Sequence, residues 1–136
     1  MGLSITGTMP TIAVDDLDRA ITYYSETLGF SVRRLEDDMG SALVEVGPSD
    51  RLLLYKSTYR RGETTSAALL VDDVESTVRE LRGKGVRFEE YDFPGLKTVD
   101  GVATSDNGLK TGWFKDSEGN ILAISNELPE VMRKAA

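Results

Sequence analysis

The 136-residue sequence contains no cysteine and no histidine, and both absences exclude chemistry. Without cysteine the chain has no disulfide, no thiol nucleophile and no iron–sulfur or zinc–thiolate site. Without histidine it lacks imidazole as a metal ligand, and it also lacks the one side chain whose unperturbed pKa lies near neutrality. An enzyme built on this chain would need a carboxylate, tyrosine or lysine whose pKa is shifted far from its ordinary value.

A surplus of positive charge and a long apolar run are also absent. The formal net charge is −7, so the chain is not expected to present the clustered basic surface that binds nucleic acid or an anionic membrane. No apolar run approaches the ~18 residues of a membrane span, and the first eight residues are too short and too polar for a secretory signal. We therefore expect a cytoplasmic protein that binds neither nucleic acid nor membranes.

The sequence repeats itself at an offset of 57 residues. Thr11–Leu17 (TIAVDDL) matches Ala68–Val74 (ALLVDDV), and each is a β-rich run that ends in Val-Asp-Asp and precedes apolar residues at helical spacing. An acidic side chain can cap each predicted helix, and Gly29 and Gly85 are placed to end them. The repeat predicts two copies of one module.

Strand patterns follow each predicted helix, so each half is predicted to be β-α-β-β-β. The expected strands are 31–36, 41–46 and 51–56 in the first copy, and 86–91, 111–115 and 121–126 in the second. The stretch Asp92–Leu109, which contains Pro94 and three glycines, predicts a long loop or lid. We expect one domain over 1–136, with module 1 at about 8–57, module 2 at about 65–127 and a tail at 128–136.

Two motifs at opposite ends of the chain resemble a known family. Val14-Asp-Asp-Leu-Asp-Arg-Ala-Ile-x-Tyr-Tyr24, followed by Leu28-Gly-Phe30, is similar to the opening module of the vicinal oxygen chelate superfamily. That superfamily includes glyoxalase I, extradiol dioxygenases and the bleomycin- and fosfomycin-resistance proteins. Trp113–Asn120 (WFKDSEGN) resembles its closing hairpin. The resemblance covers roughly 9–126 and implies an α+β fold, in which two βαβββ modules curl a mixed sheet around a cavity, usually in a homodimer.

The metal enzymes of that family use four histidine or glutamate ligands, and the resemblance maps these positions onto unsuitable residues. They fall on Met9, Leu52, Ser66 and Ala123. A thioether is a poor ligand for zinc, nickel, manganese or iron(II), and leucine and alanine have no donor atom. We expect no metal centre of the family's kind, no cofactor, and no metal-dependent glyoxalase or dioxygenase activity. A carboxylate-only cation site at Glu45, Asp116 or Glu118 is disfavoured, because acids in hairpin turns usually cap the turn.

Strand alternation predicts which side chains line the cavity. If Met9 points inward, alternate residues of the neighbouring strands do so too, and the lining is apolar with a few hydroxyls and one indole. Such a lining suits a flat or hydrophobic small molecule. The predicted ligand-binding residues are Met9, Thr11, Leu52, Leu54, Ser66, Ala68, Phe93, Trp113, Ala123 and Ser125.

The sequence favours a metal-independent binding protein that sequesters a small molecule, such as an aromatic or cationic natural product. Two alternatives stay open. One is a metal-free lyase or isomerase, for which Glu45, Tyr91 and Lys110 are the candidate catalytic residues. The other is a protein whose cavity binds no ligand. No paired carboxylates and no nucleophile–base arrangement stand out in the sequence, which is why binding without turnover is the preferred hypothesis.

Overall fold

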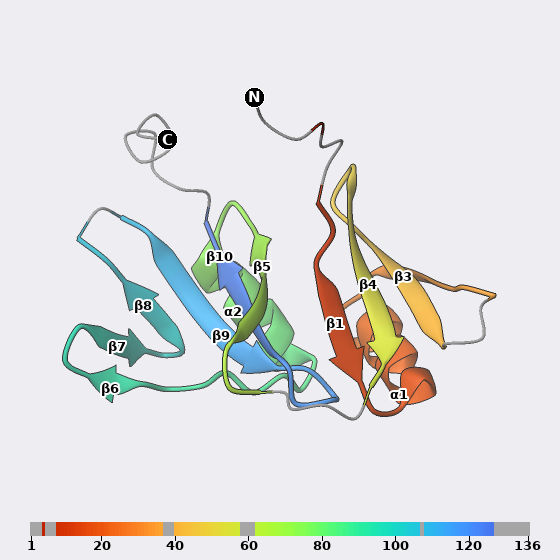
Figure 1. Cartoon of the computed structure of the whole chain (residues 1–136). Coiled ribbons are helices and arrows are strands. Elements are labelled where there is room, and N and C mark those ends of the chain that lie inside the picture. The colour runs from red at the N-terminus through yellow and green to blue at the C-terminus, as the bar shows by residue number, and fades with distance from the viewer. Residues whose placement is uncertain (1–3, 5–7, 37–39, 58–61, 107, 127–136) are drawn as a thin grey trace. The chain divides into compact units, whose positions relative to one another are not determined.

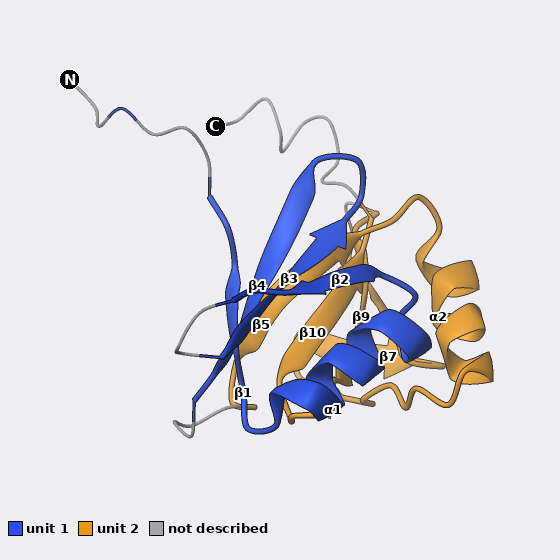
Figure 2. Cartoon of the chain, turned by 90° about the vertical axis from the view of Figure 1, so that its right-hand side faces the viewer, with its two compact units in different colours: residues 1–61 blue, residues 62–136 orange. Residues whose placement is uncertain are grey.

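The computed structural model describes residues 4, 8–36, 40–57, 62–106 and 108–126, which fall in two units, Met1–Arg61 and Gly62–Ala136 (Figure 2). Each unit contains one α-helix and one mixed sheet (Figure 1). The predicted α+β class is therefore confirmed. Among the described residues, no helix is long and apolar enough to cross a membrane. The predicted tail at 128–136 lies outside the described residues.

Unit 1 contains a four-stranded sheet of order β1-β4-β3-β2, in which β1 is parallel to β4 and the other pairs are antiparallel. The elements are β1 (Thr11–Val14), α1 (Leu17–Thr22), η1 (Tyr23–Thr27), β2 (Ser31–Arg34), β3 (Ser41–Val46) and β4 (Asp50–Lys56). The Asp16 carboxylate caps α1 by accepting a hydrogen bond of 3.0 Å from the Arg19 amide. The helix continues into the π-helical turn η1, and Gly29 follows with a φ of 80°.

Unit 2 repeats this plan with a wider, six-stranded sheet of order β5-β10-β9-β8-β7-β6. The elements are β5 (Thr65–Leu70), α2 (Val74–Gly83), β6 (Asp92–Phe93), β7 (Leu96–Val99), β8 (Val102–Thr104), β9 (Lys110–Lys115) and β10 (Ile121–Ser125). The Asp73 carboxylate accepts a hydrogen bond of 3.0 Å from the Ser76 amide, and Gly85 follows α2 with a φ of 91°. The predicted caps and glycine stops are confirmed in both copies.

Two sequence predictions in the second copy are wrong. Residues 86–91 do not form a strand, because the segment makes only an isolated bridge, between Phe88 and Phe114; the alternation that suggested a strand comes from the buried side chains of Val86 and Phe88. Asp92–Leu109 is not one long loop, since it contains β6, β7 and β8. The glycines of that stretch mark hairpin turns. Asp100 and Gly101 have φ values of 52° and 81°, the conformation of a two-residue type I′ turn between paired strands.

The helix of each unit covers one face of its sheet, and the core lies between them. α1 contacts β3 and β4, whereas α2 contacts β8, β9 and β10. The fully or nearly fully buried core side chains include Ile12, Val14, Tyr24, Val44 and Leu54 in unit 1, and Leu69, Val78, Phe114, Leu122 and Ile124 in unit 2. We call the opposite side of each sheet its helix-free face.

Candidate functional site: an aromatic cluster on the helix-free face of unit 2

Strand register brings several of the predicted ligand-binding residues onto the helix-free face of unit 2. Ala123 pairs with Trp113 on β9 and with Ala68 on β5, while Ser125 pairs with Thr111 and Leu70. Paired residues project from the same side of a sheet, and the buried Leu122 and Ile124 alternate with them on the α2 side. The alternation predicted for these strands therefore holds. A ligand-binding role for these residues stays a prediction.

Three aromatic side chains gather over this face. The Tyr91 ring meets the Trp113 indole edge-on, with ring centroids 5.5 Å apart and planes at 71°. The Phe93 ring stacks on the Tyr91 ring, with ring centroids 5.8 Å apart and planes at 27°. Tyr91 and Trp113 are half-buried, but Phe93 is 57% exposed. We call Tyr91, Phe93 and Trp113 the aromatic cluster, and it offers an accessible π surface next to the small side chain of Ala123.

Hydrogen bonds to β7 hold the segment that carries Tyr91. The Tyr91 amide donates to the Thr98 hydroxyl at 2.8 Å, and the Thr98 amide donates to the Tyr91 carbonyl at 2.9 Å. The Thr98 hydroxyl in turn donates to Glu90 Oε1 at 2.5 Å, and the Gly101 amide reaches the same oxygen at 3.0 Å. Glu90 and Thr98 thus hold the segment that carries Tyr91 against the β7–β8 hairpin. Sequence reasoning missed both, because neither the pairing of 91 with 98 nor the Asp-Gly turn was recognised.

Tyr91 is a neutral phenol at physiological pH. Burial raises the pKa of the Tyr91 hydroxyl above its usual value of 10.0, and the negative charge of Glu89 raises it further. A general base that works near neutrality needs a pKa shifted downward, so this environment opposes catalysis by a tyrosinate. The hydroxyl can instead donate or accept a hydrogen bond at the edge of the aromatic cluster.

The other two candidate catalytic residues lie away from Tyr91. The Lys110 amine donates to the Glu75 carboxylate at 2.7 Å, on the α2 side of the sheet. Glu45 lies in unit 1, where it is exposed and pairs in register with Ser31 and Arg51. Tyr91 and Lys110 occupy opposite faces of one sheet, so these two side chains do not form an acid–base pair.

The face predicted for the β4 residues is wrong. Leu52 and Leu54 are 4% and 0% exposed, and Leu54 pairs with the buried Ile12 in the core under α1. Leu53, which pairs with Thr11, occupies the helix-free face instead. The run Leu52-Leu53-Leu54 contains no polar residue, so its pattern does not reveal which side chains point inward.

Of the remaining predicted ligand-binding residues in either unit, Met9 is 43% exposed and Thr11 is exposed. Ser66 lies at an irregularity of the β5–β10 ladder, where Thr65 and Ala67 pair with successive residues of β10 and Ser66 has no register partner. Ala68 is exposed, while Ala123 and Ser125 are buried at 3% and 8%.

The side chains present do not fit a metal centre of the kind that the resemblance implies. The resemblance places one ligand position at Leu52, which faces the core. Its neighbours on the helix-free face are Arg51 and Leu53, and neither is a metal ligand. In the described part of the chain, no group of three or more aspartate or glutamate side chains is placed to hold a metal ion.

The acids of the closing hairpin hold the turn. Asp116 Oδ1 accepts hydrogen bonds of 2.8 Å from the amides of Glu118 and Asn120, and Asp116 Oδ2 accepts one of 3.1 Å from the Asn120 side chain. Asp116 is 6% exposed. Because its lone pairs face these donors, Asp116 caps the turn, as expected from its position in the sequence.

Comparisons with known proteins agree with this fold. The model of the Glyoxalase/Bleomycin resistance protein/Dioxygenase superfamily matches residues 8–124. The uncharacterized protein YraH of Bacillus subtilis (strain 168) is 31% identical over 126 residues, which cover 83% of this chain and 91% of YraH.

Solved structures share the fold at lower identity. A superfamily member from Sphaerobacter thermophilus DSM 20745 superimposes with a TM-score of 0.71 at 24% identity, over 92% of this chain and 100% of that one. TnmS3, an antibiotic binding protein from Streptomyces sp. CB03234, superimposes with a TM-score of 0.64 at 21% identity, over 93% of this chain and 100% of that one. With its repeated module and its family match over most of its length, the chain belongs to the glyoxalase/bleomycin resistance protein/dioxygenase superfamily.

Proposed function

We propose that this protein binds a small aromatic molecule without a metal ion and without turning it over. The observation that carries the proposal is the aromatic cluster of Tyr91, Phe93 and Trp113. It lies beside Ala123, onto which the family resemblance maps one of the metal-ligand positions. A planar ligand can stack on these rings, and each aromatic pair adds about 0.5–1.5 kcal/mol beyond the area it buries.

The chemistry of the cluster favours a flat ligand that is neutral or cationic. Aromatic faces attract cations, and the chain carries a net charge of −7. The neutral Tyr91 hydroxyl supplies a hydrogen bond that can fix the ligand's orientation. The class of ligand is thus an aromatic or cationic natural product, which the protein would sequester. The fold likeness to an antibiotic binding protein supports this reading.

The proposal also includes the assembly and compartment of the protein. Family members commonly pair as homodimers, and Leu70, on the edge strand β5, leaves 63% of its surface exposed. We propose a cytoplasmic homodimer. Light scattering on the purified protein checks the dimer, which requires twice the chain mass of 14.9 kDa.

Calorimetric titration with matched probes tests the binding function. N-methylquinolinium is a flat aromatic cation, 1-naphthol is a flat neutral molecule, and tetraethylammonium is a cation without a ring. The proposal predicts saturable binding of at least one flat probe, no binding of tetraethylammonium, and no change in affinity when EDTA is present. Absence of binding by both flat probes, or loss of binding on chelation, contradicts it.

Variants of the exposed ring locate the site. Phe93→Ala removes a ring that is 57% exposed, so the fold should survive, and the affinity for the flat probe should fall about tenfold. Tyr55→Ala is the matched control, because Tyr55 is an exposed aromatic residue of unit 1 that lies outside the cluster. Equal affinities of Phe93→Ala and the unmodified protein would remove the cluster from the site.

A further inference from the structure

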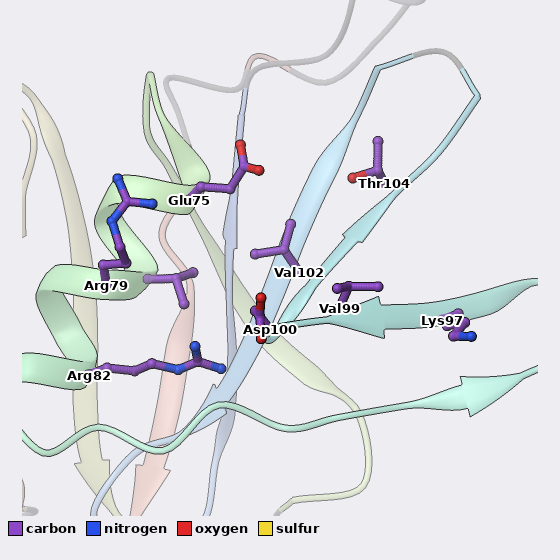
Figure 3. Close-up of a pocket in the computed structure, with 9 residues that line it drawn as sticks. Glu75, Arg79, Arg82, Lys97, Val99, Asp100, Val102 and Thr104 are labelled. Atoms are coloured by element: carbon purple, nitrogen blue, oxygen red, sulfur yellow. The ribbon is translucent and has the colours of Figure 1, made fainter.

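A cavity lies on the α2 side of unit 2, between α2 and the β7–β8 hairpin (Figure 3). Its volume is about 500 Å³, which is within the range of small-molecule sites. It is separated from the aromatic cluster by the sheet itself, since Val99 and Val102 alternate with residues of the helix-free face. The site is therefore distinct from the one proposed above.

The hairpin that forms one wall of this cavity has no counterpart in the first copy of the repeat. The sheet of unit 1 has four strands, whereas that of unit 2 has six; in the strand order β8 takes the place of β2, and β7 and β6 are the additional strands. Hydrogen bonds hold the hairpin against the preceding segment, because Glu90 accepts from the Thr98 hydroxyl and from the Gly101 amide. The wall is thus an ordered feature that distinguishes one half of the molecule from the other.

The floor of the cavity is apolar and its rim is charged. Val78 of α2 and Val102 of β8 are 1% and 8% exposed, whereas Val99 leaves 65% of its surface exposed. Figure 3 shows cations on both walls, with Arg79 and Arg82 extending from α2 and Lys97 on β7. An apolar base below a cationic rim is complementary to an amphipathic anion.

The acids at the cavity leave an excess of positive charge. Glu75 is paired with Lys110 at 2.7 Å, so it does not neutralise the rim. The nearest carboxylate oxygen recorded for Arg82 is Glu90 Oε2, at 4.0 Å, where both side chains are partly exposed and water screens the pair. Within the part of the chain that the structure describes, Arg79 forms no ion pair.

Lys97 is in the same situation, because it forms no ion pair with a described residue either. Of the two acids that line the cavity, Glu75 and Asp100, only Asp100 forms no ion pair with a described residue. Two lining cations without an ion pair, Arg79 and Lys97, against one such acid leave an excess of positive charge in the lining, on a chain whose net charge is −7. This contrast identifies the rim as the place where an anionic head group would bind.

We propose that this cavity binds a small organic anion, with the head group held by Arg79, the charge of Lys97 on the opposite wall adding attraction at longer range, and a short hydrocarbon part placed on Val99. A guanidinium can donate two parallel hydrogen bonds to a carboxylate or a phosphate, and the Lys97 amine adds a point charge. Carboxylates and phosphate monoesters share this chemistry. The experiment therefore compares the two.

Nuclear magnetic resonance titration of the full-length protein tests the proposal. Hexanoate and hexyl phosphate are the anionic probes, and hexylammonium and 1-hexanol are the controls. At least one anionic probe should give saturable shifts of amides in β7, β8 and α2, and the tighter of the two identifies the head group. Affinity should rise by up to about fourfold for each added methylene. Saturable binding of hexylammonium at the same amides, or shifts from neither anion, overturns the proposal.

Charge-neutralising variants supply the matched comparison. Arg79→Gln and Lys97→Gln should each weaken binding of the anion about tenfold. Arg87→Gln removes an exposed cation of unit 2 that does not line the cavity, and it should leave the affinity unchanged. An equal loss in Arg87→Gln would show that the anion responds to overall charge and would contradict the site. Phe93→Ala, which tests the aromatic cluster, should leave anion binding intact, so the two proposals can fail separately.

Discussion

The Thr98 hydroxyl donates to Glu90 Oε1 at 2.5 Å, and this hydrogen bond links the residue before Tyr91 of the aromatic cluster to the hairpin that forms one wall of the cavity beside α2. Thr98 is 8% exposed, so Glu90 rather than water accepts the hydrogen bond from its hydroxyl. The Gly101 amide donates to the same carboxylate oxygen. The partly exposed Glu90 therefore supports both candidate sites.

Glu90→Ala should destabilise the protein by about 1 kcal/mol. The substitution removes the acceptor of two donors, but the Glu90 side chain is 54% exposed, so water replaces part of what is lost. Urea unfolding measures the change. Glu80→Ala, at an exposed position of α2, is the control and should shift the free energy of unfolding by less than about 0.5 kcal/mol. Equal stabilities of the two variants would contradict the role of Glu90.

Gly112→Ala should destabilise unit 2 by about 1–3 kcal/mol, because the site has no room for a methyl group. A Cβ at Gly112 would lie 2.8 Å from the Gly101 carbonyl oxygen and 3.3 Å from the Phe88 ring. Gly83→Ala is the same substitution at the end of α2, where no atom lies within 4 Å and the backbone is helical. That control should be neutral or stabilising by up to about 1 kcal/mol. Thermal unfolding that ranks the two variants in the opposite order would contradict the packing described.

Asp116→Ala should cost about 2–3 kcal/mol of stability, since it leaves the amides of Glu118 and Asn120 without their acceptor. These two residues are only 6% and 2% exposed, so water cannot readily take the place of the carboxylate. Asp116→Asn keeps one acceptor oxygen and should lose less. Denaturant unfolding of both variants checks the order, and a loss of less than about 0.5 kcal/mol in Asp116→Ala would show that the turn closes without this cap.

The raised pKa of Tyr91 predicts how stability depends on alkaline pH. Because the hydroxyl ionises at higher pH in the folded state than in the unfolded state, its contribution is fully present below pH 10.0. The contribution is lost as pH rises through the folded-state pKa. Absorbance titration at 295 nm should lose a phenol of raised pKa when Tyr91 is replaced by phenylalanine. The pH dependence of unfolding above pH 10 should be shallower in that variant, and an unchanged titration curve would contradict the assignment.

Local sequence signals predicted the parts of the fold that depend on local physics. Asp16 and Asp73 are the observed helix caps, and β3 has the bounds expected from its pattern, because capping and alternation act over a few residues. The repeat and the closing-hairpin motif placed Trp113, Ala123 and Ala68 on a common face, since two-residue periodicity together with pairing fixes a face once the strands are known.

Other features depend on partners that the sequence does not reveal. Because all three residues of Leu52–Leu54 are apolar, the run does not indicate which side chains face the core. Only its pairing with β1 shows that Leu54 does. The glycines of 92–109 suggest a loop by composition alone, although Asp100-Gly101 between Val99 and Val102 is also a local hairpin signal. The contact of Tyr91 with Trp113 joins residues brought together by the sheet, and no local pattern predicts it.

Trp113 is the only tryptophan of the chain, so its fluorescence reports directly on the aromatic cluster. The most direct test is a fluorescence titration with N-methylquinolinium in the presence of EDTA. The account predicts that quenching saturates in the unmodified protein, and that the midpoint moves to about tenfold higher concentration in Phe93→Ala. Quenching that rises linearly without saturation and is the same in both proteins would reflect random collisions, and it would contradict a metal-independent binding site at these rings.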